Sequence, residues 1–352
     1  MKKIVALVII CTIISLPVSA VSSSAKAAAV INGDTGEALY AQNADMRLPM
    51  ASTTKIMTSL LLCEHGNLRK EITVTADMLR VEGSSMGLLP GDTVTLHDLL
   101  YGMLLASGND AANVTAIAIS GSVTAFAELM NKRAAELGLK NTHFVTPSGL
   151  DAEGHYTTAH DLALLAAFAL KNKEFAKAAA SKTATLCYGN PPYKRTLSNH
   201  NKLLKLYDGA IGVKTGFTKK SGRCLVSAAK RDGKLAVAVT LCDPDDWRDQ
   251  QALFDYGFSA FSLQTLVREG DTVGSVPVVG GRLERVSLTG AEEISYPLAE
   301  GERTELVLHA PQLAFAPVLA GQAGWLELRV DGVCVREVPV YYAQAVEETR
   351  PA

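Results

Sequence analysis

The sequence is short of aromatic residues, of net charge and of basic clusters. Phe, Trp and Tyr make up only 6% of its 352 residues, whereas apolar residues as a whole reach 48%, so any core must be mainly aliphatic. The formal net charge is -2, and no basic stripe of the kind that binds nucleic acid is present. We therefore expect a folded protein with no nucleic-acid partner.

The cysteines match neither a disulfide framework nor a metal site. If the first 20 residues are left out, an odd number of cysteines remains, and no two of them form a C-x-x-C pair. No cluster of cysteine and histidine has zinc spacing, so the sequence does not support a metal site. The remaining thiols are predicted to be small apolar fillers. They are Cys63, Cys187, Cys224, Cys242 and Cys334.

No segment is long and apolar enough to span a bilayer comfortably. The N-terminus instead has the features of a secretory signal: Lys2 and Lys3, an apolar run over residues 4–16, and the small-x-small site Val18-Ser19-Ala20. Residues 1–20 are therefore predicted to be a signal peptide cleaved after Ala20, with an uncleaved anchor as the alternative. The protein is expected to be exported and extracytoplasmic.

Residues 24–262 are predicted to form an α/β (α+β) domain, an antiparallel sheet flanked by helices whose first and last strands meet in one sheet. Two of its helices open with capping boxes. Strands are expected at Ala28–Asn32, Glu37–Ala41, Glu71–Thr75, Ile211–Phe217, Cys224–Lys230 and Leu235–Cys242. Helices are expected at Ile56–Cys63, Leu96–Leu105, Ala111–Ile119, Phe126–Leu137, Leu162–Leu170 and Trp247–Phe261, with the capping boxes at Thr95–Asp98 and Thr158–Asp161.

Residues 263–343 have a different character, with short alternating runs separated by glycine-rich turns. This pattern predicts a small all-β domain without an obvious group of catalytic residues. We expect this domain to act as a spacer or in docking. A polar tail, 344–352, is expected to be too short and too polar to anchor the protein in a membrane. The strands are expected at Thr272–Val279, Leu283–Leu288, Thr304–Leu308, Trp325–Val330 and Val333–Tyr341.

The segment Ser52-Thr53-Thr54-Lys55 combines a nucleophile with a base at the start of a predicted helix. Residues three apart share a helix face, so the Ser52 hydroxyl and the Lys55 amine are expected to meet. A desolvated amine loses its proton more readily and can activate a serine. The free N–H groups of the first turn can also stabilise an oxyanion. Alone, however, S-x-x-K is usually an N-cap followed by a solvated lysine.

Two later segments supply groups of a complementary kind. Ser107-Gly108-Asn109 lies in a turn between helices, where a hydroxyl can relay a proton and an amide can hold a peptide group. Lys214-Thr215-Gly216 lies on a predicted edge strand, where an extended substrate can pair with the backbone. The charge and hydroxyl can bind a carboxylate, Gly216 leaves room for a ligand, and the Phe217 N–H can complete an oxyanion hole. Each of these motifs is also common in ordinary turns and strand ends.

The three motifs together, in this order, resemble the signature of penicillin-binding proteins and serine β-lactamases. Within that superfamily the chain is similar to the low-molecular-mass D-alanyl-D-alanine carboxypeptidases of peptidase family S11, from Ala28 to Phe261. The segments 99–112, 141–163 and 212–228 are part of this resemblance. The β-rich segment that follows is similar, more loosely, to the second domain of such enzymes.

The resemblance implies a role for each motif residue. Ser52 is the acylated nucleophile, Lys55 its base, and Ser107 a proton shuttle. Asn109 binds the substrate amide, Lys214 and Thr215 bind the terminal carboxylate with Gly216 beside them, and the N–H groups of Ser52 and Phe217 hold the oxyanion. The implied substrate is the D-Ala-D-Ala end of peptidoglycan stem pentapeptides, with β-lactam antibiotics as covalent inhibitors. The resemblance implies no cofactor and no metal.

One departure from the family pattern and two alternatives remain. Relatives with a basic residue upstream of K-T-G use it for carboxylate binding, but this chain has Asn199-His200-Asn201 there. A class A-like β-lactamase would need an E-x-x-L-N segment between Ser107 and Lys214, and none occurs. A non-catalytic penicillin-binding sensor is the other alternative, usually coupled to membrane helices. His143, His155 and His160 are expected to be hydrogen-bonded loop or cap residues rather than ligands.

Overall fold

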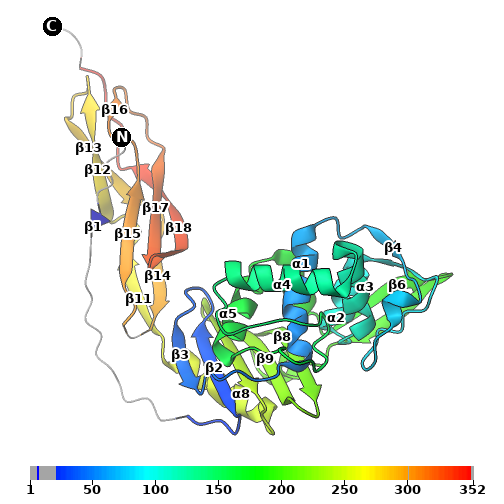
Figure 1. Ribbon diagram of the computed structural model, residues 1–352. Helices are drawn as coiled ribbons and strands as arrows, with labels where there is room; N and C mark the ends of the chain where they lie inside the picture. The colour runs from blue at the N-terminus through cyan, green and yellow to red at the C-terminus, as the bar shows by residue number, and fades with distance from the viewer. Residues whose placement is uncertain (1–5, 8–20, 300, 350–352) are drawn as a thin grey trace. The chain divides into compact units, whose positions relative to one another are not determined.

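The computed structural model describes residues 6–7, 21–299 and 301–349 (Figure 1). These divide into two compact units, with the division between Ser259 and Ala260, close to the predicted boundary at 262. Most of the predicted signal segment, 1–20, lies outside the described residues. Its residues Ala6–Leu7 form a short strand, β1, that pairs with β15 (Thr304–His309).

The first unit is built on a five-stranded antiparallel sheet with the order β3-β2-β10-β9-β8. These strands are β2 (Ala27–Asn32), β3 (Ala38–Gln42), β8 (Ala210–Thr218), β9 (Gly222–Arg231) and β10 (Lys234–Leu241). Strand β2 pairs with β10, which confirms that the first and last strands of this unit meet in one sheet. Strand β8 lies at the edge, so one side of its backbone is open to a ligand.

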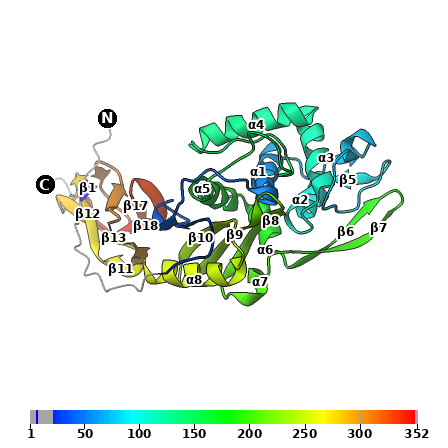
Figure 2. The same ribbon diagram turned by 60° about the horizontal axis from the view of Figure 1, so that its bottom comes forward.

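Helices cover both faces of this sheet, as the two ribbon views show (Figure 2). On one face lies α5 (Ala159–Leu170), which packs on β2 and β10, and on the other lies α8 (Asp246–Ser259). Helix α5 is apolar on nearly all sides because it is enclosed between the sheet and further helices. The helices that pack on it are α1 (Lys55–His65) and α6 (Lys173–Ala180), and the other helices of this layer are α2 (Leu96–Leu104), α3 (Asn109–Ser120) and α4 (Val123–Glu136).

One of the two predicted capping boxes is complete and the other is not. The Thr95 side chain accepts from the Asp98 N–H, and the Asp98 carboxylate accepts from the Thr95 N–H. At the start of α5 the Thr158 hydroxyl accepts from the Asp161 N–H, but the reciprocal bond does not form. The Asp161 carboxylate instead accepts from the Asn141 N–H and the Thr142 hydroxyl, so it holds the preceding loop.

Several small elements were not expected from the sequence. A hairpin of β6 (Thr183–Gly189) and β7 (Pro192–Ser198) precedes the short helix α7 (Leu203–Leu206). Strand β5 (Thr93–Thr95) is also unexpected and pairs with β4 (Glu71–Thr73), which confirms the strand predicted at Glu71–Thr75, and η2 (Asp77–Leu79) is a single 3-10 turn. These elements are short and half-exposed, so their sequences show no hydrophobic periodicity long enough to predict them.

The second unit is all β, as predicted. Its seven-stranded sheet has the order β1-β15-β17-β18-β13-β12-β16, and β11 pairs with β14 beside it. The tail predicted at 344–352 is not simply polar, because Val346 is buried and pairs with Val318. The remaining strands are β11 (Ser262–Val267), β12 (Thr272–Val279), β13 (Arg285–Gly290), β14 (Ile294–Leu298), β16 (Ala314–Phe315), β17 (Gln322–Val330) and β18 (Val333–Tyr342).

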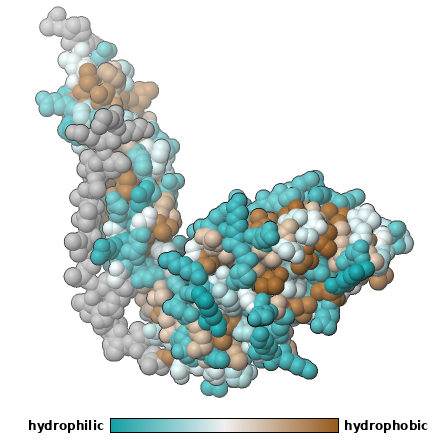
Figure 3. Space-filling view, in the orientation of Figure 1, coloured by the Kyte–Doolittle hydropathy of each residue, from teal (hydrophilic) through white to brown (hydrophobic). Residues whose placement is uncertain are grey.

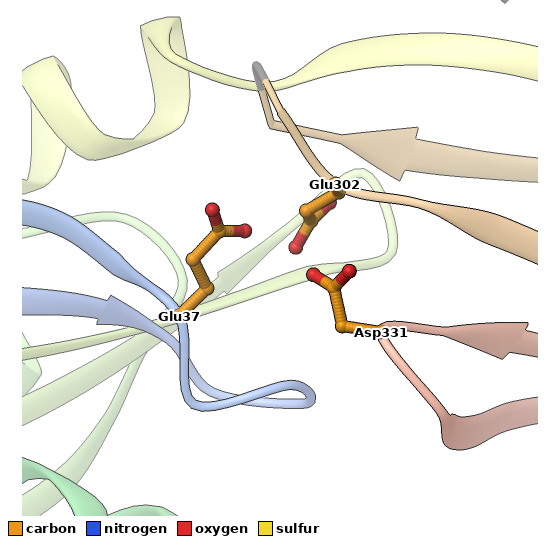
Figure 4. A group of neighbouring side chains, drawn as sticks. All are labelled: Glu37, Glu302 and Asp331. Atoms are coloured by element: carbon orange, nitrogen blue, oxygen red, sulfur yellow. The ribbon is translucent and has the colours of Figure 1, made fainter.

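The surface of the second unit carries both carboxylates and apolar groups. The Glu302 carboxylate accepts from the Ala299 N–H and the Asp331 carboxylate from the Arg303 N–H, which fixes the turns beside β15 and β17. Figure 4 draws both side chains. Apolar atoms gather at the end of the second unit where β16 lies (Figure 3), and Phe315 is 70% exposed.

Two further findings bear on the sequence-based expectations. The prediction that the cysteines are apolar fillers holds for the buried Cys224 and is wrong for Cys187 and Cys334, whose positions on strands leave them exposed. No single described helix has both the length and the apolar composition to cross a bilayer. Helices α3 and α4 meet both criteria only as a pair, with a bend of 84° between them.

Candidate active site

Ser52 lies in a tight 3-10 turn, η1 (Ala51–Thr54), that leads directly into α1. We had expected an ordinary α-helical start here. The preceding residue, Ala51, has φ +47°, a conformation that costs energy for a residue with a side chain. The Ala51 carbonyl accepts from the Thr54 hydroxyl and packs against Gly149, where any Cβ would overlap it. These contacts hold the nucleophile turn in place.

Lys55 is completely buried and its amine meets three oxygen atoms. The Nζ lies 2.9 Å from Ser52 Oγ, 2.7 Å from Asn109 Oδ1 and 2.6 Å from the Ser148 carbonyl oxygen. The two shorter contacts are to atoms that can only accept, whereas a serine hydroxyl can also donate. A neutral amine fits this arrangement, because its two hydrogens serve the two acceptors and its lone pair faces the Ser52 hydroxyl.

The electrostatics of the site favour that neutral form. Burial lowers the pKa of Lys55 well below its ordinary value, the charge of Lys214 lowers it further, and Asp110 acts in the opposite direction. Lys214 is also buried, and burial lowers its pKa to about 7. Loss of water is therefore the larger cause of the lowered Lys55 pKa, and repulsion by Lys214 adds to it.

The turn between α2 and α3 brings the second motif to Lys55. Ser107 has φ +59° and lies with Asn109 at the start of α3, both only 5% exposed. The Asn109 Oδ1 accepts from Lys55, and its Nδ2 donates to the Glu82 carbonyl at 2.7 Å. The amide group has two N–H donors, so one remains for a substrate carbonyl.

The third motif lies on the edge strand β8, with its open side toward the nucleophile. A Cβ at Gly216 would approach Ser52 N to 3.1 Å, a tight contact that glycine avoids at this close approach of strand and turn. The Thr218 N–H donates to Ser221 Oγ in the turn to β9. Because neighbouring residues of a strand direct their N–H groups to opposite sides, the Phe217 N–H faces the open edge. Together with Ser52 N it can form an oxyanion hole.

A cleft of about 290 Å³ joins these motifs. Ser52, Ser107 and the strand residues Thr215–Phe217 line it, and Lys214 Nζ lies behind them, 2.9 Å from the Thr215 carbonyl. All eight predicted site residues are thus in or directly beside one site. The remaining lining residues were not predicted as site residues: Ser84, His200, Arg223, Asp246 and Trp247.

Two supporting residues, Ser148 and Asp110, have no motif that would have identified them. The Ser148 carbonyl is an acceptor for Lys55, and backbone acceptors leave no trace in a sequence. The Asp110 carboxylate accepts from the N–H groups of residues 86–88 and from Ser85 Oγ, fixing the loop beside the cleft. Only its position next to Asn109 could have drawn attention to it.

His155 supports the site as a neutral side chain. Its Nδ1 accepts from the Val145 N–H at 2.9 Å, so its Nε2 carries the proton and donates to Thr54 Oγ1 at 2.8 Å. Burial lowers the pKa of His155 to about 4, which keeps the ring neutral. The expectation of a hydrogen-bonded loop histidine is confirmed, and this one connects the 141–156 loop to the nucleophile turn.

Comparison with known proteins agrees with this geometry. Residues 15–245 match the peptidase S11 family, described as D-alanyl-D-alanine carboxypeptidase, and residues 261–348 match the family described as the C-terminal domain of penicillin-binding protein 5. The chain belongs to the S11 family of D-alanyl-D-alanine carboxypeptidases. It is therefore a serine hydrolase of that family, as its three motifs indicated.

Relatives of this family cover nearly the whole chain. D-alanyl-D-alanine carboxypeptidase DacF of Bacillus subtilis is 37% identical over 92% of this chain and 86% of its own length. DacC of Escherichia coli is 33% identical over 94% and 86%. The crystal structure of a Streptomyces DD-transpeptidase, 34% identical, superposes with a TM-score of 0.65 over 70% of this chain and all of its own. The predicted β-lactamase/transpeptidase-like fold is confirmed.

Proposed function

We propose that the protein is a serine D-Ala-D-Ala carboxypeptidase that removes the terminal D-alanine of peptidoglycan stem pentapeptides through an acyl-enzyme on Ser52. The observation that carries this proposal is the contact of 2.9 Å between a buried, depressed-pKa Lys55 amine and the Ser52 hydroxyl. A fully desolvated amine beside a serine is the arrangement that makes the hydroxyl a nucleophile at neutral pH.

In the acylation step, the Lys55 amine takes the Ser52 proton as Oγ attacks the carbonyl carbon of the penultimate D-alanine. The oxyanion that forms is held by the N–H groups of Ser52 and Phe217. Asn109 holds the amide on the acyl side of the bond through its remaining N–H. Lys214 and Thr215 hold the carboxylate of the terminal D-alanine, so the scissile bond lies directly over Ser52.

Collapse of the tetrahedral intermediate needs a proton on the leaving amine. The Ser107 hydroxyl, which lines the cleft, donates that proton and is reprotonated from the Lys55 ammonium. D-Alanine then departs, and Lys55 is neutral again. A water molecule then attacks the ester carbon, and its proton passes to Lys55. As the ester bond breaks, Lys55 returns this proton to Ser52 Oγ and the enzyme is restored.

The family context supports an extracytoplasmic site of action, because peptidoglycan lies outside the cytoplasm. We propose that residues 1–20 direct export and that β-lactams acylate Ser52 as substrate mimics. We also propose that residues 24–262 form the catalytic domain and 263–343 the accessory domain. The absence of the E-x-x-L-N segment favours slow release of the drug over β-lactamase turnover.

The direct test is release of D-alanine from diacetyl-Lys-D-Ala-D-Ala by the wild type, by Ser52→Ala and by the control Ser22→Ala, which changes an exposed serine outside the site. We expect the wild type and the control to release D-alanine and Ser52→Ala to release none above background. Equal release by Ser52→Ala would overturn the assignment. Penicillin that is hydrolysed in many turnovers, rather than retained, would favour the β-lactamase instead.

A further inference from the structure

The hairpin formed by β6 and β7 carries a largely buried arginine that the mechanism above does not use. Arg195 lies on β7, and only 11% of its side chain is exposed. Its guanidinium carbon lies 4.3 Å from the ring centre of Tyr188 and 4.2 Å from that of Tyr193, so two rings of the hairpin hold the cation between them. Arg195 is not among the residues that line the cleft.

The polar contacts of the Arg195 guanidinium lie outside its own hairpin. Its Nη1 donates to the Gly87 carbonyl, and its Nη2 lies 3.6 Å from Asp92 Oδ2. Its Nε and Nη2 are buried and have no hydrogen-bond partner among residues 21–299 and 301–349. Burial of such groups is unfavourable, so a contact made outside the hairpin must contribute to keeping the cation in this place.

The segment 84–88, which we call the cleft loop, is held from two sides. On one side, the Asp110 carboxylate accepts from the N–H groups of residues 86–88. On the other side, the carbonyls of the first two of these residues accept from the Tyr188 hydroxyl, at 2.8 Å, and from Arg195. A negative charge thus faces the N–H ends of these peptide groups and a positive charge faces a carbonyl end, so both charges stabilise this conformation of the loop.

The cleft loop also contacts the catalytic centre. Ser84 lines the cleft, and its carbonyl accepts from the Asn109 N–H at 2.7 Å. The Asn109 side chain contacts Lys55 and, in the proposed mechanism, binds the amide on the acyl side of the substrate. Asp110, which holds the loop, is the next residue of α3. A displaced cleft loop would therefore move Asn109 through both of these connections.

We propose that Arg195 is a positioning residue for the reaction, because it fixes the cleft loop and, through the loop, the side chain of Asn109. This inference rests on the proposed function and goes beyond it, because it assigns a role to a hairpin outside the cleft. The groups proposed to bind the terminal carboxylate, Lys214 and Thr215, lie on β8 and are not part of this series of contacts. Loss of Arg195 should therefore affect the chemical step more than substrate binding.

The first test compares Arg195→Met with the matched control Arg231→Met. The Arg231 guanidinium also lies over two rings, 5.0 Å from Tyr207 and 4.9 Å from Phe258, but its contacts do not include the cleft loop. With diacetyl-Lys-D-Ala-D-Ala we expect kcat of Arg195→Met to fall about tenfold, because Asn109 is misplaced, while KM changes by less than about twofold. The control should keep both values. An unchanged kcat in Arg195→Met, or a rise in KM alone, would overturn the proposal.

The second test uses Tyr188→Phe, which keeps the ring beside Arg195 and removes only the hydroxyl that bonds to the cleft loop. We expect kcat to fall about threefold with KM again unchanged, since one of the two contacts between hairpin and loop remains. Because this change is small, the variant tests the proposal even if Arg195→Met does not fold. A kcat equal to that of the wild type would count against the hairpin as a support of the site.

A third measurement follows the cleft loop without a substrate. Hydrogen exchange, detected by mass spectrometry in peptides that cover 84–88, should be faster in Arg195→Met and Tyr188→Phe than in the wild type and Arg231→Met. Equal exchange in all four proteins, or faster exchange throughout the first unit, would refute a local role of the hairpin. If the wild type releases no D-alanine, the carboxypeptidase assignment fails, and exchange still tests the contact between hairpin and loop.

Discussion

Replacing Asn109 by Asp tests whether Lys55 acts as a neutral base. The Asn109 Oδ1 lies 2.7 Å from Lys55 Nζ, and Asn109 is only 5% exposed. A carboxylate of the same shape would therefore face the amine with little water around the pair. Two unit charges at this distance attract by about 6 kcal/mol at an effective dielectric constant of about 20. Desolvation of the new carboxylate reduces this, and close ion pairs commonly shift a pKa by about one to three units.

The carboxylate stabilises the charged form of Lys55, so the amine keeps its proton to higher pH. At pH 7 we expect acylation by a fluorescent penicillin to slow, by about tenfold for each unit by which the pKa of Lys55 in the variant exceeds 7. Most of this loss should be recovered as the pH rises, because the variant amine then deprotonates. The assay is the rate of covalent labelling measured across pH for the wild type and Asn109→Asp.

Asn109→Ala is the matched control, because it removes the same acceptor without adding a charge. It is expected to lower the labelling rate without moving the acid limb of the profile to higher pH. If Asn109→Asp and Asn109→Ala gave profiles with the same pH dependence, differing only in height, the reasoning that Lys55 is the titrating base would be refuted.

Three further predictions concern the supports of the site. Folding lowers the pKa of His155 from 6.5 to about 4, so the neutral ring stabilises the protein fully above about pH 6.5, and this stabilisation is lost as the pH falls toward 4. Between these pH values the free energy of unfolding, measured with urea, should change by about 3 kcal/mol less in His155→Gln than in the wild type. Gly149→Ala, with φ +88° and an overlap with the Ala51 carbonyl, should lower the unfolding temperature and slow penicillin labelling, whereas Gly66→Ala, with φ +76° in open space, should leave labelling unaffected. Iodoacetamide should label Cys187 in the native protein and Cys224 only after unfolding, because Cys224 is buried with its pKa raised to about 11; labelling of both at equal rates would contradict this.

The sequence was sufficient to identify the proposed catalytic and binding groups. Ser52 and Lys55 are close in the chain, and Lys214 to Phe217 lie on one strand, so spacing and secondary structure were enough to relate them. The edge position of β8 and the meeting of β2 with β10 also followed from the strand and helix order.

The sequence could not show the parts of the site that depend on backbone contacts between distant segments. The Ser148 carbonyl and the close fit of Gly149 to Ala51 exist only once the 141–156 loop has folded against η1. The second capping box was incomplete because a tertiary contact at Asn141 and Thr142 competed with the local one for Asp161. Cys187 and Cys334 are exposed because of how their strands, β6 and β18, are placed in the folded protein, and the local sequence does not show this placement.

The central claim is that Ser52 becomes covalently acylated with help from Lys55. Its most direct test is peptide mass spectrometry after incubation with benzylpenicillin, for the wild type and for Ser52→Ala. We expect a penicilloyl adduct on the peptide that contains Ser52 in the wild type and no adduct in the variant. An adduct on any other residue, or an unmodified Ser52 in protein that still releases D-alanine, would contradict the account.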